Sequence, residues 1–119
     1  MNGSEKTVPE TDFFAFVDAR DVGEAHARAY KSPEAAGQRY FCTARGYTYQ
    51  QVCDIIRKDF PEKRDLVPEG TPHAPFPDVY KVDNSKAKKE LGITFSNLET
   101  VIHDQAAEFI RIEKEAGKA

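Results

Sequence analysis

The stretch "FFAFVDARDVGEAHARAY", Phe13 to Tyr30, decides the expected fold class because its hydrophobic pattern changes at Asp18. Residues 13–17 are aromatic and apolar without alternation, which is typical of a short strand covered on both faces. From Val22 onward, apolar residues recur at the spacing of one helical face. The carboxylate of Asp18 is suited to accept the free N–H groups of a first helical turn. The sequence therefore predicts a strand that runs directly into a helix capped by Asp18.

The same order of elements follows once more along the chain. "QRYFCTA", Gln38 to Ala44, predicts a second strand that ends in a turn. After it, Thr48 and Gln51 have the three-residue spacing of a capping box, and Pro61 should stop the helix that they begin. Two strands joined by a helix form a βαβ unit, in which the strands are parallel.

The second half of the chain combines irregular and helical segments. Prolines recur from Pro61 to Pro77, which predicts a long loop. A brief strand is expected over residues 79–83, followed by a short helix in "NSKAKKELGI" that ends in a left-handed cap at Gly92. Ser96 and Glu99 predict a second capping box, at the start of a last helix with a largely apolar stripe.

These elements predict an α/β fold whose sheet is too small. Two or three short strands cannot cover four helices, and parallel sheets normally contain several strands that are covered on both faces. The length of 119 residues suits one domain. We therefore expect residues 1–119 to be a single incomplete domain, with a partial Rossmann-like βαβ segment followed by a helical part.

Composition and charge exclude several classes of protein. The hydrophobic share of 39%, with 11% aromatic residues, is typical of a folded domain. The net charge is −3 with both signs interspersed, so no basic surface for nucleic acid or an anionic membrane is expected. No apolar run has the length of a membrane span and the polar N-terminus is unlike a signal peptide, so the expected location is cytoplasmic. Cys42 and Cys53 lack the spacing of a redox motif and are expected to be free, buried thiols.

Four segments resemble, in their order, the C-terminal third of an extended short-chain dehydrogenase/reductase of the NAD-dependent epimerase/dehydratase family. The most similar branch contains dihydroflavonol reductases, cinnamoyl-CoA reductases and microbial aldehyde and ketone reductases. Its patterns are F-V-D-V-R-D-V-A-x-A-H, a G-R-Y strand, a helix ending in F-P, and D-N-S-K-A-x-x-E-L-G. Here they read "FVDARDVGEAH", "GQRYFCTA", "YTYQQVCDIIRKDFP" and "DNSKAKKELG". The resemblance implies an NADPH-dependent carbonyl reductase, of which this chain represents the helical substrate subdomain.

Two motifs that such reductases need are absent from the 119 residues. NADPH is bound through a glycine-rich turn, and the seven glycines here lie too far apart to form one. Family catalysis uses a tyrosine with a lysine four residues later. The residues at that distance from the five tyrosines are Glu34, Ala44, Gln51, Cys53 and Asn84. The chain is therefore expected to be a truncated reductase that has no catalytic or cofactor-binding residue and does not bind NADPH or reduce a substrate alone.

Aromatic side chains provide candidates for a substrate pocket, because such pockets are mainly apolar with few polar groups. For at least two of Phe13, Phe14 and Phe16, core packing is the stronger interpretation. His73, in the proline-rich loop, is the one histidine that we associate with a substrate. The three histidines lack the spacing of a zinc face, so no metal site is expected. The candidates for lining a substrate pocket are Phe14, Phe16, His73, Phe76 and Tyr80.

The charged group Asp18, Arg20 and Asp21 has two interpretations. Two carboxylates and a guanidinium have the composition of an acid–base pair with an anion clamp. Three charges at a strand-to-helix boundary are, however, more typical of a helix cap with a salt bridge. We therefore interpret these residues as a structural joint.

Three classes of function remain open from the sequence. The first is part of a reductase that acts on a small carbonyl substrate. The second is a non-catalytic binding or regulatory module that pairs with a full-length reductase or with itself through uncovered apolar faces. The third is a small cofactor-free enzyme that uses a carboxylate or a histidine for proton transfer.

Overall fold

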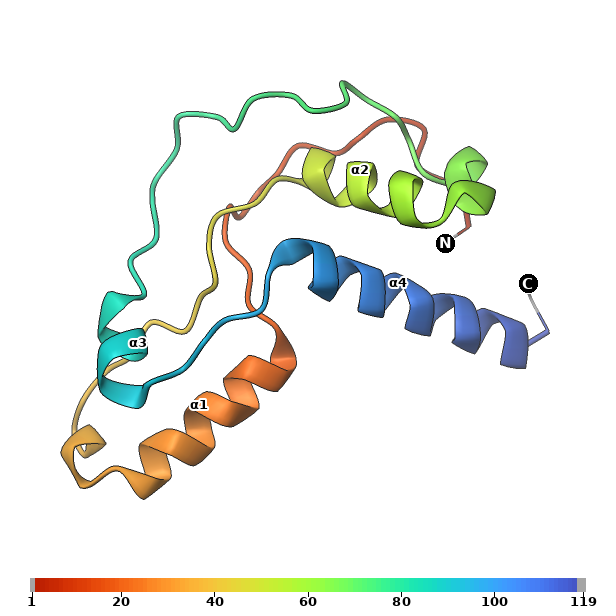
Figure 1. The fold of residues 1–119 in the computed structure, drawn as a ribbon. Helices are drawn as coiled ribbons and strands as arrows, with labels where there is room; N and C mark the ends of the chain where they lie inside the picture. Colours follow the sequence, from red (N-terminus) through yellow and green to blue (C-terminus); the bar gives the residue numbers. More distant parts are fainter. Residues whose placement is uncertain (1, 118–119) are drawn as a thin grey trace. The chain divides into compact units, whose positions relative to one another are not determined.

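Residues 2–117 are described by a computed structural model, in which they form two units. Unit 1 contains residues 2–13, 47–78 and 98–117, and unit 2 contains residues 14–46 and 79–97. Figure 1 shows the helices in chain order, with α1 and α3 in unit 2 and with α2 and α4 in unit 1. Each unit is therefore assembled from segments that are far apart in the sequence.

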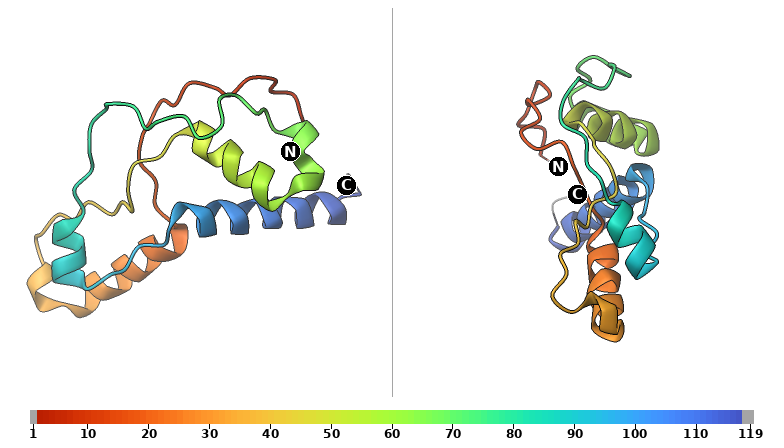
Figure 2. Two further views of the ribbon diagram at one scale, coloured as in Figure 1. Left: turned by 45° about the horizontal axis from the view of Figure 1, so that its top comes forward. Right: turned by 90° about the vertical axis from the view of Figure 1, so that its left-hand side faces the viewer.

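Unit 2 is built on the helix that follows Asp18. Helix α1 spans Ala19–Lys31 with Asp18 as its N-cap, and the short 3-10 helix η1, Pro33–Ala35, comes directly after it. Helix α3, Ser85–Leu91, lies beside α1 (Figure 2) and ends at Gly92, whose φ of 65° is the predicted left-handed cap. These helix predictions are confirmed because caps and breakers act within a few residues of the helix end.

The core of unit 2 consists mostly of small side chains. Its buried alanines are Ala25 of α1, Ala35 of η1 and Ala87 of α3. Leu91 and Ile93 complete the cluster and are 6% and 4% exposed. Because an alanine buries little apolar area, Leu91 and Ile93 contribute more buried apolar area than the three alanines. Ala29, Tyr40, Cys42 and Phe95 are partly buried and pack against this cluster.

The predicted strands are absent from residues 2–117. Residues 13–17, 38–44 and 79–83 lack regular secondary structure apart from one antiparallel bridge between Phe16 and Arg45. The structure therefore does not show the predicted partial Rossmann-like βαβ segment, whose strands would be parallel. The physical reason is that a strand forms only where a neighbouring backbone satisfies its N–H and C=O groups. An apolar pattern cannot supply that neighbour.

In unit 1, α2 spans Tyr49–Asp59 and begins with the predicted capping box. Thr48 Oγ1 accepts from the N–H of Gln51 at 3.3 Å, and the N–H of Thr48 donates to Gln51 Oε1 at 3.2 Å. The chain after α2 differs from the prediction, because the 3-10 helix η2 occupies Pro61–Leu66 and the irregular loop begins only at Val67. A proline at the first helical position has no N–H to leave unpaired, so it favours such a start.

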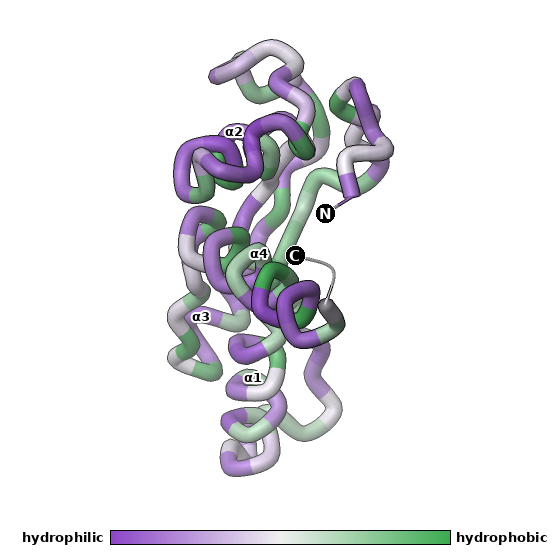
Figure 3. The backbone as a smooth tube through the Cα atoms, turned by 90° about the vertical axis from the view of Figure 1, so that its right-hand side faces the viewer, coloured by the Kyte–Doolittle hydropathy of each residue, from purple (hydrophilic) through white to green (hydrophobic). Residues whose placement is uncertain are grey.

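Helix α4, Leu98–Glu115, packs along α2 (Figure 2). At this contact, His103 Nδ1 lies 3.0 Å from Asp59 Oδ2, and the imidazole stacks on Phe60 with ring centroids 5.0 Å apart. The helix is amphipathic, and hydrophobic and hydrophilic positions alternate along it in Figure 3. The predicted stripe is buried only in part, because Leu98 is 1% exposed whereas Phe109 is 48% exposed.

Ser96, predicted to begin a capping box with Glu99, makes polar contacts within unit 2. Helix α4 begins at Leu98, so Asn97 and not Ser96 immediately precedes its first turn. The backbone N–H and the hydroxyl of Ser96 instead donate to the carboxylate of Asp21. Ser96 thus bonds to Asp21, which lies 75 positions earlier in the chain.

Both cysteines are free, and they are partly buried rather than fully buried as expected. Cys42 packs against the core cluster of unit 2. Burial is the main cause that raises the pKa of the Cys53 thiol, so this thiol is a poor nucleophile near neutral pH. Within residues 2–117, the structure contains no helix long and apolar enough to cross a bilayer.

Candidate functional site

Two of the aromatic candidates, Phe14 and Tyr80, form a pair in unit 2. Their rings meet edge to face, with centroids 6.0 Å apart and an interplanar angle of 80°. The backbone N–H of Phe14 also donates to the Tyr80 hydroxyl at 2.7 Å. Tyr80 is 52% exposed. Aromatic side chains with a few polar groups are typical of small-molecule pockets, so the pair is of the residue type expected for a substrate pocket.

Phe16, the third candidate in unit 2, is engaged by its neighbours. Its carbonyl accepts from the Ala44 N–H at 2.8 Å and from the Thr43 hydroxyl at 3.1 Å. The guanidinium carbon of Arg45 lies 5.8 Å from the centre of its ring, within the range of a cation–π contact. Phe16 is therefore held in place by both its backbone and its ring.

The other two candidates, His73 and Phe76, belong to unit 1. His73 is exposed and has a φ of 57°, and its N–H donates to Asp54 Oδ2 at 3.0 Å. Phe76 is 45% exposed. The five candidates are thus divided between the units, and within unit 2 the rings of Phe14 and Tyr80 contact each other.

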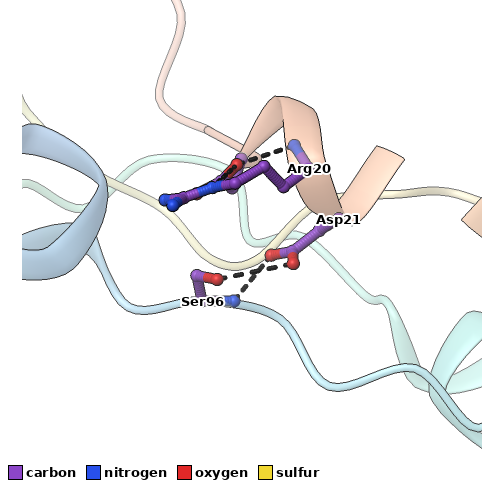
Figure 4. Close-up of polar contacts among 4 residues, drawn as sticks. Arg20, Asp21 and Ser96 are labelled. Atoms are coloured by element: carbon purple, nitrogen blue, oxygen red, sulfur yellow. Dashed lines mark hydrogen bonds and ion pairs between the residues drawn. The ribbon is translucent and has the colours of Figure 1, made fainter. Parts of the chain in front are cut away.

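The charged group at the start of α1 makes a cap and two sets of polar contacts. Asp18, only 5% exposed, accepts from the Arg20 N–H at 2.7 Å and pairs with the Arg20 guanidinium at 2.5 Å. Asp21 Oδ2 accepts from the Ser96 N–H at 2.7 Å, and its Oδ1 lies 3.4 Å from the Ser96 hydroxyl (Figure 4). Both carboxylates are occupied by donors, which leaves little freedom for acid–base chemistry.

The Arg20 guanidinium bonded to Asp18 holds the pKa of that carboxyl below its ordinary value, although burial acts in the opposite direction. A lowered folded-state pKa means that the unfolded chain binds a proton more readily. We therefore expect this carboxylate to contribute stability above an unfolded pKa of about 3.9, and to lose it as the pH falls through the folded-state pKa.

A pH series of urea denaturation on the wild type and Asp18→Asn checks this expectation. Asparagine can still cap the helix but cannot pair with Arg20 as a charge. The variant should be less stable near about pH 7, and the difference should shrink toward about pH 2. Asp65→Asn, at an exposed position, serves as the control and should show no such trend. A stability difference for Asp18→Asn that stays constant with pH would contradict the charged pairing.

Further polar contacts of unit 2 involve residues to which we assigned no site role from the sequence. Asn84 Nδ2 donates to the carbonyls of Thr43 and Ala44, at 2.6 and 3.2 Å. Arg28 Nη1 donates to the carbonyls of Leu91 and Gly92, both at 3.1 Å. Asn84 lies in the D-N-S-K motif, which was the one signal for it. Nothing in the sequence pairs Arg28 with the end of α3.

The start of α1 does not fit the pyrophosphate of a dinucleotide. Such a site needs a helix N-terminus with free N–H groups behind a glycine-rich turn. At the start of α1, the Asp18 carboxylate already accepts from the first turn, and its negative charge would repel a phosphate. We therefore assign no step of a reaction to a cofactor bound by these residues. Among residues 2–117, no group of three or more His, Cys, Asp or Glu side chains is arranged to hold a metal ion.

Known proteins with similar sequences include several reductases. No protein-family model matches the chain. It is 39% identical over 92 residues to the ketoreductase azaE of Aspergillus niger, and 36% identical over 112 residues to the NADPH-dependent methylglyoxal reductase GRE2 of Saccharomyces cerevisiae. These alignments cover 76% and 92% of this chain, but 27% and 32% of the relatives. The chain therefore spans about a third of the length of the curated relatives that it matches.

A solved structure extends the comparison to three dimensions. The yeast methylglyoxal/isovaleraldehyde reductase Gre2, complexed with NADPH, matches with a TM-score of 0.81 and 32% identity. The match covers 96% of this chain and 38% of that one. The backbone of this chain thus follows part of an α/β reductase, even though no strand forms within residues 2–117.

Proposed function

Because the chain belongs to the extended short-chain dehydrogenase/reductase family and corresponds to the C-terminal part of its members, we propose that it acts as the substrate-side portion of an NADPH-dependent carbonyl reductase. The observation that carries the proposal is that family-like motif segments bond to one another within unit 2. The D-N-S-K segment donates through Asn84 to the strand-like segment at Thr43. The F-V-D-x-R-D-V segment bonds through Asp21 to Ser96.

Such bonds make the motifs a scaffold rather than a reaction centre. A scaffold of this kind is useful to a reductase because it presents apolar side chains to a substrate in a fixed arrangement. In our proposal Phe14, Phe16 and Tyr80 of unit 2 are substrate contacts, and His73 and Phe76 of unit 1 are further candidates for such contacts. The proposed substrate class is a small aldehyde or ketone, in line with the methylglyoxal named for the yeast relative.

Hydride and proton transfer to the carbonyl are assigned to residues outside these 119. Carbonyl reduction needs a hydride donor and a group that gives a proton to the oxygen. No glycine-rich turn and no tyrosine with a lysine four residues later occur in these 119 residues. We therefore propose that the chain contributes substrate contacts, and that it needs the cofactor-binding portion of a reductase for turnover.

A graft into yeast Gre2 tests this proposal. The chain replaces the matching C-terminal part of Gre2, and reduction of methylglyoxal is followed by NADPH consumption. The graft should be active, whereas Gre2 shortened by that part and the 119-residue chain alone should not be. A folded graft that binds NADPH but reduces neither methylglyoxal nor a series of other aldehydes would overturn the proposal. So would turnover by the chain alone.

A further inference from the structure

Two polar side chains of α2, Gln50 and Asp54, bind the irregular loop that follows η2. Gln50 Nε2 donates to the carbonyl of Glu69 at 2.7 Å, and Gln50 Oε1 accepts from the Thr71 N–H at 3.1 Å. Asp54 Oδ2 accepts from the His73 N–H at 3.0 Å. The pair is also linked, because Gln50 Nε2 donates to Asp54 Oδ1 at 2.9 Å. We call Gln50 and Asp54 the loop bracket and residues 69–73 the bracketed loop.

The bracketed loop has a backbone that requires support. Gly70 and His73 both have positive φ, of 58° and 57°. Among residues 2–117, His73 is the single non-glycine residue in this region of backbone space, which side chains with a Cβ disfavour. A residue held in such a conformation usually depends on surrounding contacts, and functional loops are common places for it.

At Gly70 the backbone of the loop lies close to the side chains of Gln50 and Val8. A Cβ atom at Gly70 would overlap with Gln50 Oε1 and would lie 2.6 Å from Val8 Cγ2. Only a glycine therefore lets the backbone approach the bracket this closely. The loop is fitted against α2 on one side and against the N-terminal segment on another.

Gln50 and Asp54 bond to main-chain groups of the bracketed loop and not to its side chains. Their side chains accept from the backbone N–H groups of Thr71 and His73 and donate to the backbone carbonyl of Glu69. The His73 side chain is exposed, and the exposed Phe76 follows three residues later. The bracket thus fixes a segment that carries an imidazole and an aromatic ring at the surface.

We propose that Gln50 and Asp54 are positioning residues that hold residues 69–73 in one conformation, and thereby determine where His73 and Phe76 meet a carbonyl substrate. The inference rests on the proposed function, because it concerns the same substrate-facing side chains. A loop that is ordered before binding loses less conformational freedom when a ligand arrives. Loss of the bracket should therefore weaken substrate binding more than it slows the chemical step.

Amide hydrogen exchange on the 119-residue chain tests the bracket directly. Gln50→Ala should accelerate exchange at the Thr71 N–H roughly tenfold, and Asp54→Ala should do the same at the His73 N–H, since each amide loses its acceptor. Protection within α1 should not change. Gln105→Ala and Asp65→Ala, both at exposed positions, are the matched controls and should leave these two amides as they are. Unchanged exchange at both amides would overturn the proposal.

Kinetics in the Gre2 graft separate positioning from simple stabilisation. Each bracket variant should raise the KM for methylglyoxal by roughly five- to tenfold, with kcat and the KM for NADPH nearly unchanged. Faster exchange without a change in KM would show that the bracket only stabilises the loop, which overturns the inference and leaves the proposed function intact. A parent graft that folds and binds NADPH but reduces no aldehyde would overturn the proposed function and the positioning role together, while the exchange result would still report whether the bracket holds the loop.

Discussion

Replacing Leu91 with alanine is expected to lower the free energy of unfolding of the chain by about 2–5 kcal/mol. Leu91 is 6% exposed and belongs to a core whose other buried members are three alanines and Ile93. Removal of its side chain leaves a cavity beside residues that are too small to fill it. A domain of ordinary stability unfolds with about 5–15 kcal/mol, so the loss is a large share of the total.

Urea denaturation, followed by the helical signal, measures this loss. Leu91→Met nearly preserves the buried volume and should cost less than about 1.5 kcal/mol, which makes it the matched control. Amide exchange on Leu91→Ala should show the largest loss of protection in α1 and α3, which share this core. A change of less than about 1 kcal/mol for Leu91→Ala would mean that the cluster does not hold unit 2 together.

The second large effect is expected at Asn84, whose amide nitrogen donates to two carbonyls. Its bonds to Thr43 and Ala44, at 2.6 and 3.2 Å, connect the start of α3 to a segment about 40 positions earlier. Thr43 is 3% exposed, so water cannot easily replace the lost donor. Asn84→Ala should therefore cost about 1–3 kcal/mol, the penalty of leaving a buried acceptor unpaired.

Asn84→Asp distinguishes the bonds from the shape of the side chain. Aspartate has nearly the same size, but its carboxylate accepts hydrogen bonds and cannot donate to a carbonyl. At neutral pH it would face two acceptors with its own negative charge, so this variant should be at least as unstable as Asn84→Ala. Wild-type stability of Asn84→Asp would contradict the role of the two donated bonds. Thermal and urea denaturation of both variants provide the measurement.

Both predictions concern the way in which unit 2 is held together without a sheet. In an α/β protein, ladder hydrogen bonds between strands normally connect segments that are far apart in sequence. In residues 2–117 one antiparallel bridge is the single such pairing. Bonds from side chains to the backbone, donated by Asn84 and Arg28 and accepted by Asp21, connect the segments in its place.

The contacts of the candidate site likewise join residues that are far apart in the sequence. Phe14 and Tyr80 were each selected from the sequence as pocket-lining candidates, but the bond between them joins positions 66 residues apart. Gln50 and Asp54 lie four residues apart and therefore share a face of α2. Their spacing does not identify the loop that they bind, which only the tertiary structure shows.

The sequence by itself determined the four α-helices, the caps at Asp18, Thr48 and Gly92, and the relationship to the reductases. Asp18, the capping box of Thr48 with Gln51, and Gly92 each act on backbone groups no more than a few residues away, so their effects can be read from local spacing. The relationship follows from the order of several motifs along the chain.

Only the tertiary structure decided which extended segments pair and which polar groups meet across the chain. A strand depends on a neighbouring backbone, and the apolar residues 13–17 and 38–44 look the same in sequence whether that neighbour is present or not. Ser96 illustrates the second case, because its spacing suited a helix cap while its bonds go to Asp21. Such contacts depend on the closure of long loops, and a residue pattern carries no information about the partner at the other end.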